Sequence, residues 1–419
     1  MAITHPITSA FATTSPSSGP AGVRSETVRS ANLAIILREL HVHGPASRSE
    51  LVARTGLTRS AIGALVGELV KADLVREQRA ASDGSPGRPS PVAAPVVERN
   101  VVLAVDVAVD SLAVAAIGLG GVVLHSIRVD RPRERIAVDA TVDDIVAMVH
   151  DLERLLDPQA RILGIGVGVV GLVNRTDNTV SIAPNLGWHD VAFGEHLQLA
   201  LHTHVPVLVS NDADLAALAE VRRGVAAGER DVLHVWGEVG VGGGLVSHGE
   251  AITGAAGFAG EIGHLPVNPD GRACQCGSVG CWETEVGEGV LLERSGRSPD
   301  GGRDAVDALL DDADRGEPKA LAALATQARW LGIGLAGLIN VLNPSMVVLG
   351  GLLGRVFPYV QADVEAEIER RALASSRRNV RVVTSALAAD APLMGAAELA
   401  FEGLLGDPLG TLRKISTSR

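Results

Sequence analysis

The sequence has only three cysteines in 419 residues, and all of them lie within an eight-residue stretch. Three thiols cannot all be paired in disulfides, so an oxidised, exported scaffold is disfavoured. The N-terminal segment also lacks the basic start and the continuous apolar core of a signal peptide. These absences favour a cytoplasmic protein that has a specific use for its cysteines.

Long hydrophobic runs are also missing. Glycine, aspartate or histidine interrupts every apolar stretch before it reaches the roughly eighteen residues that a membrane-spanning helix needs. Membrane insertion is therefore not expected. Hydrophobic residues still make up 46% of the chain and glycine contributes 48 residues, which is ample material for buried cores. The length predicts two or three domains.

The negative charge is unevenly distributed. The net charge is −12, yet residues 1–100 hold 11 basic and 8 acidic side chains, whereas the remainder holds 26 and 41. A basic front on an acidic body suits a nucleic-acid-binding head, because DNA phosphates attract the first and repel the second. An excess of three positive charges is also ordinary surface variation, so charge alone does not decide the matter.

The cysteines belong to a cluster of metal-binding residue types. It reads Glu261-x-x-His264 followed by Cys274-x-Cys276-x-x-x-x-Cys281-x-Glu283. Three thiolates and an imidazole complete the tetrahedral shell that zinc prefers, and a closed shell of this kind stabilises a fold instead of activating water. Coincidental buried cysteines are the alternative, but the clustering disfavours it. We therefore predict a structural zinc ion bound by His264, Cys274, Cys276 and Cys281.

The first hundred residues predict a small helical domain after a tail. Residues 1–26 are rich in Ser, Thr, Ala and Pro with almost no large apolar side chains, which predicts disorder. Apolar residues at helical spacing then predict a helix that ends at His43-Gly44-Pro45 and buries Leu33, Ile36, Leu37 and Leu40. Ser47-x-x-Glu50 is a capping box for a second helix, which ends at Thr55-Gly56.

A third helix follows the glycine turn, which is the order of a helix-turn-helix unit. It is predicted to bury Ile62, Leu65, Val66, Leu69 and Val70. In such a unit the second helix of the pair enters the major groove and reads bases with its N-terminal side chains. The residues predicted to contact DNA from this helix are Thr58, Arg59, Ser60 and Gly63.

A predicted wing completes this domain. Strands at residues 74–77 and 92–97 bracket Gly84-Ser85-Pro86-Gly87-Arg88-Pro89, which would hold Arg88 extended toward phosphates or a minor groove. Residues 27–97 are therefore expected to form a winged helix-turn-helix DNA-binding domain. The alternative for three short helices is a small packing or protein-binding bundle, but turn, exposed Arg59 and basic wing occur in the order that DNA binding requires.

From residue 98 onward the pattern predicts strands in two similar units. The first has apolar runs at 101–105, 112–117 and 122–129, and the second at 232–235 and 243–246 with a third strand after residue 250. Between them, residues 162–173 alternate glycine with branched residues, which is typical of a buried strand closely approached by another backbone. Two such units separated by helices predict two related α/β lobes with a ligand between them.

Several segments together are typical of one family. They are Gly166-Val167-Gly168-Val169-Val170-Gly171, Asn211-Asp212-Ala213-Asp214, Gly240-Val241-Gly242-Gly243-Gly244 and the 261–283 cluster. With the helix-turn-helix they resemble the ROK family of repressors, open reading frames and kinases, from about residue 28 onward. The resemblance implies an α/β fold in which an actin-like or ribonuclease-H-like, two-lobed sugar-binding domain over residues 98–419 follows the winged head.

The resemblance also implies ligands and partners: a sugar or sugar derivative between the lobes, operator DNA, and a homodimer or homotetramer. The residues that match the family's sugar site are Gly171, Asn185, Asn211, Asp212, Glu261, His264 and Glu283. Carboxylates and an amide suit sugar hydroxyls, which both donate and accept hydrogen bonds. Ordinary solvated surface is the alternative for Glu261 and Glu283. If these glutamates do belong to the sugar site, the metal would hold His264 and Glu283 beside the sugar.

In kinases of this family the residue matching Asp212 is the catalytic base, and two glycine-rich loops bind ATP phosphates. Here the first loop, Asp-x-Gly-Gly-Thr in the kinases, reads Asp106-Val107-Ala108-Val109-Asp110, and the second, Gly-Thr-Gly, reads Glu238-Val239-Gly240. The added side chains and carboxylates oppose a polyphosphate. We therefore expect no catalysis, and a sugar-responsive transcriptional repressor in which Asp212 binds sugar.

Two alternatives remain from the sequence. One is an active ATP-dependent sugar kinase with a regulatory DNA-binding head, in which Asp212 is catalytic. The other is a zinc-stabilised scaffold that binds neither sugar nor DNA. The remaining histidines, His41 and His43 among them, are too dispersed to suggest a second metal site.

Overall fold

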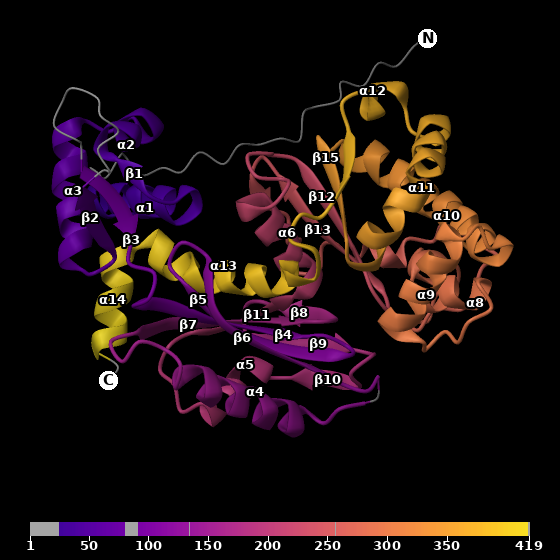
Figure 1. Ribbon diagram of the computed structural model, residues 1–419, viewed down its shortest axis with the longest axis horizontal. Coiled ribbons are helices and arrows are strands. Elements are labelled where there is room, and N and C mark those ends of the chain that lie inside the picture. Colours follow the sequence, from indigo (N-terminus) through magenta and orange to yellow (C-terminus); the bar gives the residue numbers. More distant parts are fainter. Residues whose placement is uncertain (1–24, 80–90, 134, 256, 418–419) are drawn as a thin grey trace, which may run out of the picture.

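The computed structural model describes residues 25–79, 91–133, 135–255 and 257–417. The N-terminal head, at the left of Figure 1, combines three helices with a three-stranded sheet of order β1-β3-β2. Its elements are α1 (Ser25–His43), β1 (Ala46–Ser47), α2 (Arg48–Thr55), α3 (Arg59–Lys71), β2 (Val75–Arg79) and β3 (Pro91–Pro95). Helix α1 begins at Ser25, so it includes the last two residues of the predicted tail, and residues 1–24 lie outside the described part of the chain.

The local signals in the head produce the predicted helices. The apolar face of α1 is buried, and Ser47 and Glu50 form both hydrogen bonds of the capping box at the start of α2. Gly56 ends α2 with a φ of 70°, a left-handed conformation that glycine adopts without a Cβ penalty. Helix α3 buries four of its five predicted residues. The prediction for Val70 is wrong: it is 39% exposed at the last turn.

The predicted wing strands form, because β2 and β3 pair antiparallel from Val75↔Pro95 to Arg79↔Pro91. The proline at each end of β3 is tolerated since a strand end does not need every backbone N–H. Arg88, predicted to contact DNA from the wing, lies outside the described residues.

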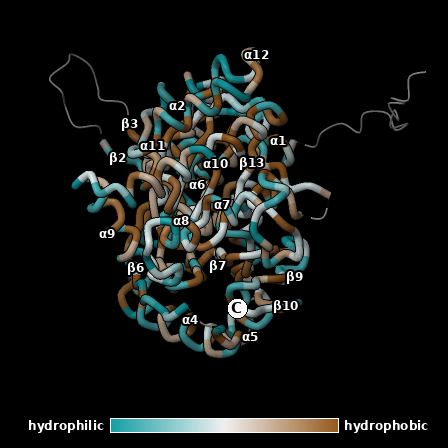
Figure 2. Tube along the Cα trace, turned by 90° about the vertical axis from the view of Figure 1, so that its right-hand side faces the viewer, coloured by the Kyte–Doolittle hydropathy of each residue, from teal (hydrophilic) through white to brown (hydrophobic). Residues whose placement is uncertain are grey.

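Lobe I follows the head and is built on a five-stranded sheet of order β11-β7-β4-β5-β6. Its elements are β4 (Asn100–Val107), β5 (Ser111–Gly118), β6 (Val122–Asp130), α4 (Val138–Glu153), β7 (Arg161–Val169), β8 (Leu172–Asn174), β9 (Thr179–Ala183), β10 (Trp188–Val191), α5 (Phe193–Ala200) and β11 (Val207–Asn211). Helices α4 and α5 cover one face of the sheet, and hydrophilic segments mark the outer rim at α4 in Figure 2.

Lobe II repeats this plan with the sheet order β14-β13-β12-β15-β16. Its elements are β12 (Val232–Gly237), β13 (Val241–Ser247), β14 (Glu250–Ala251), η1 (Ile262–His264), α7 (Glu283–Val286), α8 (Glu288–Arg294), α9 (Gly302–Asp314), α10 (Pro318–Leu342), β15 (Met346–Gly350), α11 (Gly351–Arg371), α12 (Ala374–Arg377), β16 (Arg381–Thr384) and η2 (Ala388–Asp390). In each lobe the first strand pairs antiparallel with the second and parallel with a later one. The predicted pair of related lobes is confirmed.

Three further helices join these parts: α6 (Asp212–Arg223), α13 (Ala391–Gly406) and α14 (Pro408–Thr417). Helix α13 crosses the glycines of β7 so closely that a Cβ on Gly166 would lie 1.9 Å from the carbonyl oxygen of Ala396. The close approach expected at this strand is therefore the approach of a helix. In Figure 1, α13 runs from the boundary of the two lobes to the head, and α14 packs beneath the head.

Among the described residues one helix, α10, is long and apolar enough to cross a membrane by composition alone. Its apolar stretch is 61% buried, and α10 packs against α11 and α8 within lobe II. The core helix of a globular lobe meets the same test of length and composition, so this helix is weak evidence for a membrane span.

Candidate functional site

The four predicted metal ligands come together on lobe II. One ligand atom from each of His264, Cys274, Cys276 and Cys281 lies within 4.8 Å of all the others. The Cys276 and Cys281 sulfurs are 3.6 Å apart, and the Cys274 sulfur is 3.7 Å from His264 Nδ1. In a tetrahedral zinc site with Zn–S distances of about 2.3 Å, neighbouring sulfurs lie about 3.8 Å apart. The cluster can therefore hold a metal ion.

The loop that carries the ligands is shaped by its glycines. Gly277 and Gly280 have φ values of 91° and 71°, and the Gly277 N–H donates to the Cys274 carbonyl oxygen. The loop closes on itself through hydrogen bonds from the Cys274 N–H to the Ser278 oxygen and from the Gly280 N–H to the Arg272 oxygen. Few apolar side chains anchor this segment, so a bound metal would be its main cross-link.

Two carboxylates flank the metal cluster. Glu283 Oε1 lies 2.9 Å from the Cys274 sulfur and 3.6 Å from His264 Nδ1. Glu261 Oε2 lies 3.7 Å from His264 Nε2, on the other side of the ring. Burial raises the pKa of Glu261, which the His264 charge partly offsets. His264 thus turns Nδ1 toward the sulfurs and Nε2 toward Glu261, so the ring lies between the metal cluster and a second carboxylate.

Helix α6 carries the next predicted site residues at its N-terminus. The Asn211 side-chain oxygen caps the helix by accepting from the N–H groups of Ala213 and Asp214, while its amide donates to the Gly171 oxygen over 2.8 Å. Most of the hydrogen-bonding capacity of Asn211 is used inside the protein. Its predicted role as a direct sugar ligand is therefore limited to one remaining N–H.

Asp212 and Asp214 bring two more carboxyl groups to this end of α6. Burial, followed by repulsion from Asp106, raises the pKa of Asp212 to about 8. Burial also raises the pKa of Asp214 to about 7; Arg175 opposes this shift and the charge of Glu261 adds to it. Asp214 therefore lies near enough to Glu261 for the two carboxylates to repel each other. Asp214 belongs to the Asn211–Asp214 segment that resembles the family, but it was not among the residues predicted to bind the sugar.

Asn185 is the second amide of the predicted sugar site, and its role stays a prediction. It is half-buried in the turn between β9 and β10, beside Trp188, whose indole N–H donates to the Ile136 oxygen. Trp188 is buried against Phe193, with ring centroids 5.0 Å apart, so its role is packing.

The two loops that match the kinase phosphate loops face each other across the lobes. They line a cavity of about 40 Å³ together with Asp106, Asp212, Arg128 and Arg303. Typical ligand pockets measure about 300–1,000 Å³. The Glu238 carboxylate lies against the start of α11, where a Cβ on Gly351 would be 2.8 Å from Glu238 Oε1. Burial raises the pKa of Glu238 to about 7 and of Asp106 to about 6.

An arginine that the sequence did not single out ties the loops together. Arg133, after β6, donates to Asp110 over 2.7 Å and also to Glu288 of α8. It joins the first loop on lobe I to lobe II. Only the fold reveals this contact, because 155 positions separate Arg133 from Glu288.

The predicted DNA-contact residues lie at the exposed start of α3. Thr58 caps the helix by accepting from the Ala61 N–H, and its hydroxyl lies 3.2 Å from that of Ser60. Arg59 is exposed beside them. Gly63 was expected to be exposed but is half-buried, with Arg48 Nη1 3.5 Å from the position of a Cβ.

These features define a class: a winged helix-turn-helix head on a two-lobed, actin-like sugar kinase fold, with a cluster of metal-binding residue types on lobe II. The chain belongs to the ROK family, whose sequence profile matches residues 102–402. The profile of the MarR family matches residues 34–84, within the head.

Relatives fall into two groups by how much of the chain they match. The xylose repressor of Bacillus spizizenii is 26% identical over 383 residues, which cover 90% of this chain and 97% of that protein. The glucokinase of Streptomyces coelicolor is 30% identical over 320 residues, 72% of this chain and 98% of that enzyme.

Solved structures divide in the same way. A ROK family transcriptional regulator, described as a homologue of the E. coli MLC protein, has a TM-score of 0.75 at 25% identity and covers 93% of this chain and 99% of its own. A ROK family glucokinase from Streptomyces griseus, in complex with glucose and AMPPNP, has a TM-score of 0.64 at 28% identity and covers 73% and 100%.

Proposed function

We propose that this protein is a sugar-responsive transcriptional repressor of genes for carbohydrate uptake or metabolism. One observation carries the proposal: the winged head shares a single hydrophobic core with lobe I, in which Leu37 and Leu40 of α1 belong to the same buried cluster as Phe401 and Leu404 of α13. A DNA-binding head built into a sugar-binding fold couples the two ligands. Full-length similarity to a xylose repressor supports it.

The proposed effector is a sugar that binds between the lobes, near Asp212, Glu261, His264 and Glu283, with Asn211 and Gly171 shaping the pocket. The carboxylates can accept from vicinal hydroxyls, which is the chemistry that discriminates among sugars. The metal is proposed to be structural zinc, since three thiolates and one imidazole fill a tetrahedral shell and leave no position for water. We further propose a cytoplasmic homodimer or homotetramer that binds an inverted repeat.

Operator binding is the direct test. The full-length protein should bind a duplex from its own promoter region with an affinity that falls steeply as salt rises, and an effector sugar should change that affinity. Replacing Arg59 by alanine should weaken binding by roughly 10-fold or more, because a base or phosphate contact is lost. Fluorescence anisotropy at several salt concentrations measures both effects.

Arg154→Ala serves as the matched control for that experiment, since Arg154 is a 71% exposed arginine of lobe I and lies outside the head. It should leave DNA affinity unchanged. Binding that is absent in the wild type, or equally strong in the Arg59 variant, would contradict the proposed repressor.

Loss of kinase activity is the second part of the proposal. Glu238 and Asp110 place carboxylates where the kinases bind phosphates, and Arg133 is engaged by Asp110 and Glu288 instead of being free to bind a nucleotide. Placing a polyphosphate next to these carboxylates would cost several kcal/mol at intermediate dielectric. The ROK kinase relatives make an ATP-dependent sugar kinase the competing function.

A coupled assay for ADP release separates the two functions. Across a panel of hexoses, pentoses and amino sugars, we expect turnover no higher than in the absence of sugar, while a family glucokinase assayed in parallel should be active. Sugar-dependent ADP formation by the purified wild type would identify a kinase and overturn this part of the proposal.

A further inference from the structure

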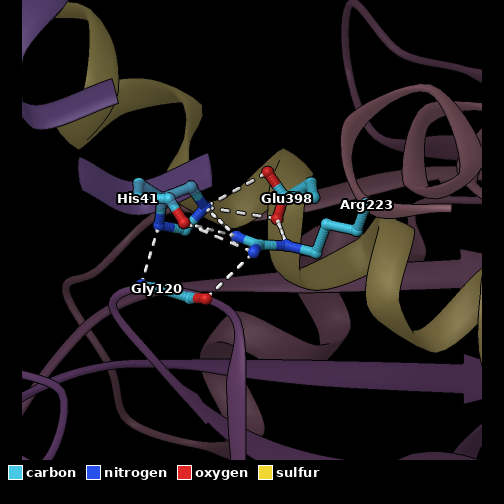
Figure 3. Close-up of polar contacts among 4 residues, drawn as sticks. All are labelled: His41, Gly120, Arg223 and Glu398. Carbon is cyan, nitrogen blue, oxygen red and sulfur yellow. Dashed lines mark hydrogen bonds and ion pairs between the residues drawn. The ribbon is translucent and has the colours of Figure 1, made fainter. Parts of the chain in front are cut away.

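A buried polar cluster lies where the head meets lobe I and the joining helices α6 and α13. This junction cluster consists of His41 of α1, Gly120 in the turn between β5 and β6, Arg223 at the end of α6, and Glu398 of α13 (Figure 3). The side chains of His41, Glu398 and Arg223 are 0%, 3% and 12% exposed. Four segments that are far apart in the sequence therefore converge on one desolvated site.

The hydrogen bonds of the cluster are directional. The Gly120 N–H donates to His41 Nδ1 over 3.0 Å, so the neutral ring carries its proton on Nε2 and donates it to Glu398, 3.2 Å away. Arg223 donates to Glu398 and, over 2.9 Å, to the Gly120 oxygen. Burial lowers the pKa of His41, which keeps the ring neutral. Burial tends to raise the pKa of Glu398, but His41 and Arg223 outweigh it and hold the value at about 2.

Arg223 ends the helix whose other end is at the proposed sugar pocket. Helix α6 has 12 residues, from Asp212 to Arg223, and so spans about 18 Å. Its N-cap is Asn211, next to Asp212 and Asp214. One rigid helix thus has the effector site at its first turn and the junction cluster at its last residue.

Helix α6 is closely packed on two sides, against lobe II and against α13. Toward lobe II, Cβ atoms on Gly242 and Gly244 would lie 2.8 and 2.3 Å from the Cβ atoms of Ala213 and Ala217. Toward α13, a Cβ on Gly395 would lie 1.9 Å from the Leu215 oxygen. Close-packed interiors transmit displacement because they have no voids to absorb it. A change in the distance between the lobes would therefore move α6 as a unit.

The head is held to the body at a second point as well. Arg161, at the start of β7, donates to the Ala72 oxygen at the end of α3, over 2.7 Å, and to Asn100. The Asn100 amide in turn donates to the Asp73 oxygen. The recognition helix is thereby fixed to lobe I, so a force applied to His41 would turn the head about this attachment.

We infer that α6 transmits sugar occupancy to the DNA-binding head, and that Arg223, through His41 and Glu398, is the positioning residue that connects them. This inference rests on the proposed repressor function. A guanidinium fork that must donate to the Glu398 carboxylate and to the carbonyl oxygens of Gly120 and His41 tolerates little displacement. Movement of α6 would then displace α1, because the contacts of Arg223 cannot adjust to it.

The test measures coupling rather than affinity. For each variant, calorimetry measures the dissociation constant of a sugar with and without promoter duplex. The sugar is D-xylose or D-glucose, whichever raises the melting temperature of the wild type. The ratio of the two constants is the coupling factor, which is about 5–150 in allosteric proteins. Arg223→Lys keeps the charge but loses the fork. It should lower the factor to below about twofold, while sugar affinity without DNA and DNA affinity without sugar each stay within about threefold of wild type.

Two matched controls and a second variant complete the design. Arg222→Lys changes the adjacent residue, and Glu402→Gln changes an exposed carboxyl one turn along α13 from Glu398. Both should keep the wild-type factor. If Arg223→Lys does not fold, Glu398→Gln replaces it. The amide keeps the shape of the side chain, but it loses the negative charge and one of the two acceptor oxygens that His41 and Arg223 contact, so the coupling factor should again fall.

The outcomes separate the two claims. If the wild type shows coupling and the folded Arg223→Lys and Glu398→Gln variants show the same factor, the inference is wrong and the repressor function stands. If the wild type binds neither sugar nor DNA, the proposed function fails, and the inference that depends on it falls with it.

Discussion

Cys276→Ser is expected to release the metal and to abolish the sugar response of DNA binding. Cys276 is the exposed cysteine of the cluster, so serine fills its place without creating a cavity, and only coordination is lost. Apparent binding free energies of about 10–16 kcal/mol for structural zinc in small domains indicate how strongly such an ion orders its loop. Part of the lost binding free energy appears as a lower free energy of unfolding. Each 1 kcal/mol of it lowers the melting temperature by roughly 2–4 °C in domains of 150–250 residues.

The sugar response should be lost together with the metal, because His264 and Glu283 lie between the metal cluster and the proposed sugar site. Elemental analysis should find one zinc ion per chain in the wild type and none in the variant, and calorimetry should find no sugar binding. Gln275→Ser is the control, since Gln275 is an exposed neighbour between two ligands. A Cys276→Ser protein that keeps a full sugar response after chelation would show that the metal does not support the pocket.

The sequence predicted the features that depend on neighbouring residues. The capping box at Ser47 and Glu50, the glycine that ends α2, and the paired wing strands all form as expected, because each is decided within a few positions. The metal cluster was predictable for the same reason: its ligands occupy only 18 positions, from His264 to Cys281. The spacing alone brings their donor atoms together.

The failed predictions concern how far single positions of α3 are buried. Val70 follows the helical spacing of the buried residues of α3, but it falls in the last turn and is 39% exposed. Periodicity identifies a face of a helix and does not say how far along that face the core extends. Gly63 differs in the opposite sense: it was expected to be exposed and is half-buried beside Arg48 of the preceding helix, and its contact with DNA stays a prediction.

The contacts that couple the parts could not be predicted from the sequence. His41 is separated from Glu398 by 357 positions, and the sequence offered it only as one of several dispersed histidines. The Arg133 bridge has the same character. Such pairs depend on how the lobes and the head pack in three dimensions, and a single sequence carries no local signal of them. The sites that local patterns predict are therefore ligand sites, whereas the connections between them need the structure.

Asp212→Asn is expected to weaken sugar binding strongly while making the sugar-free protein more stable at alkaline pH. A sugar hydroxyl that donates to a carboxylate contributes about 1.5–3 kcal/mol, so the amide should bind sugar roughly 10–100-fold more weakly. Calorimetry at pH 8, where the wild-type carboxyl ionises, measures this loss. Asp143→Asn removes an exposed carboxyl of α4 and should change neither property.

The stability effect follows from the pKa of Asp212, which burial and the neighbouring Asp106 raise from 3.8 to about 8 in the folded protein. A carboxyl with a raised folded-state pKa favours folding below pH 4, and this contribution is lost as pH rises from about 4 to 8. Asparagine does not titrate, so the melting temperature of the variant should exceed that of the wild type by an amount that grows from pH 5 to pH 8. Because Asp212 keeps some contact with solvent, about 1 kcal/mol or somewhat more is expected, short of the full shift. A difference in melting temperature that does not change with pH would show that Asp212 is already ionised in the sugar-free protein.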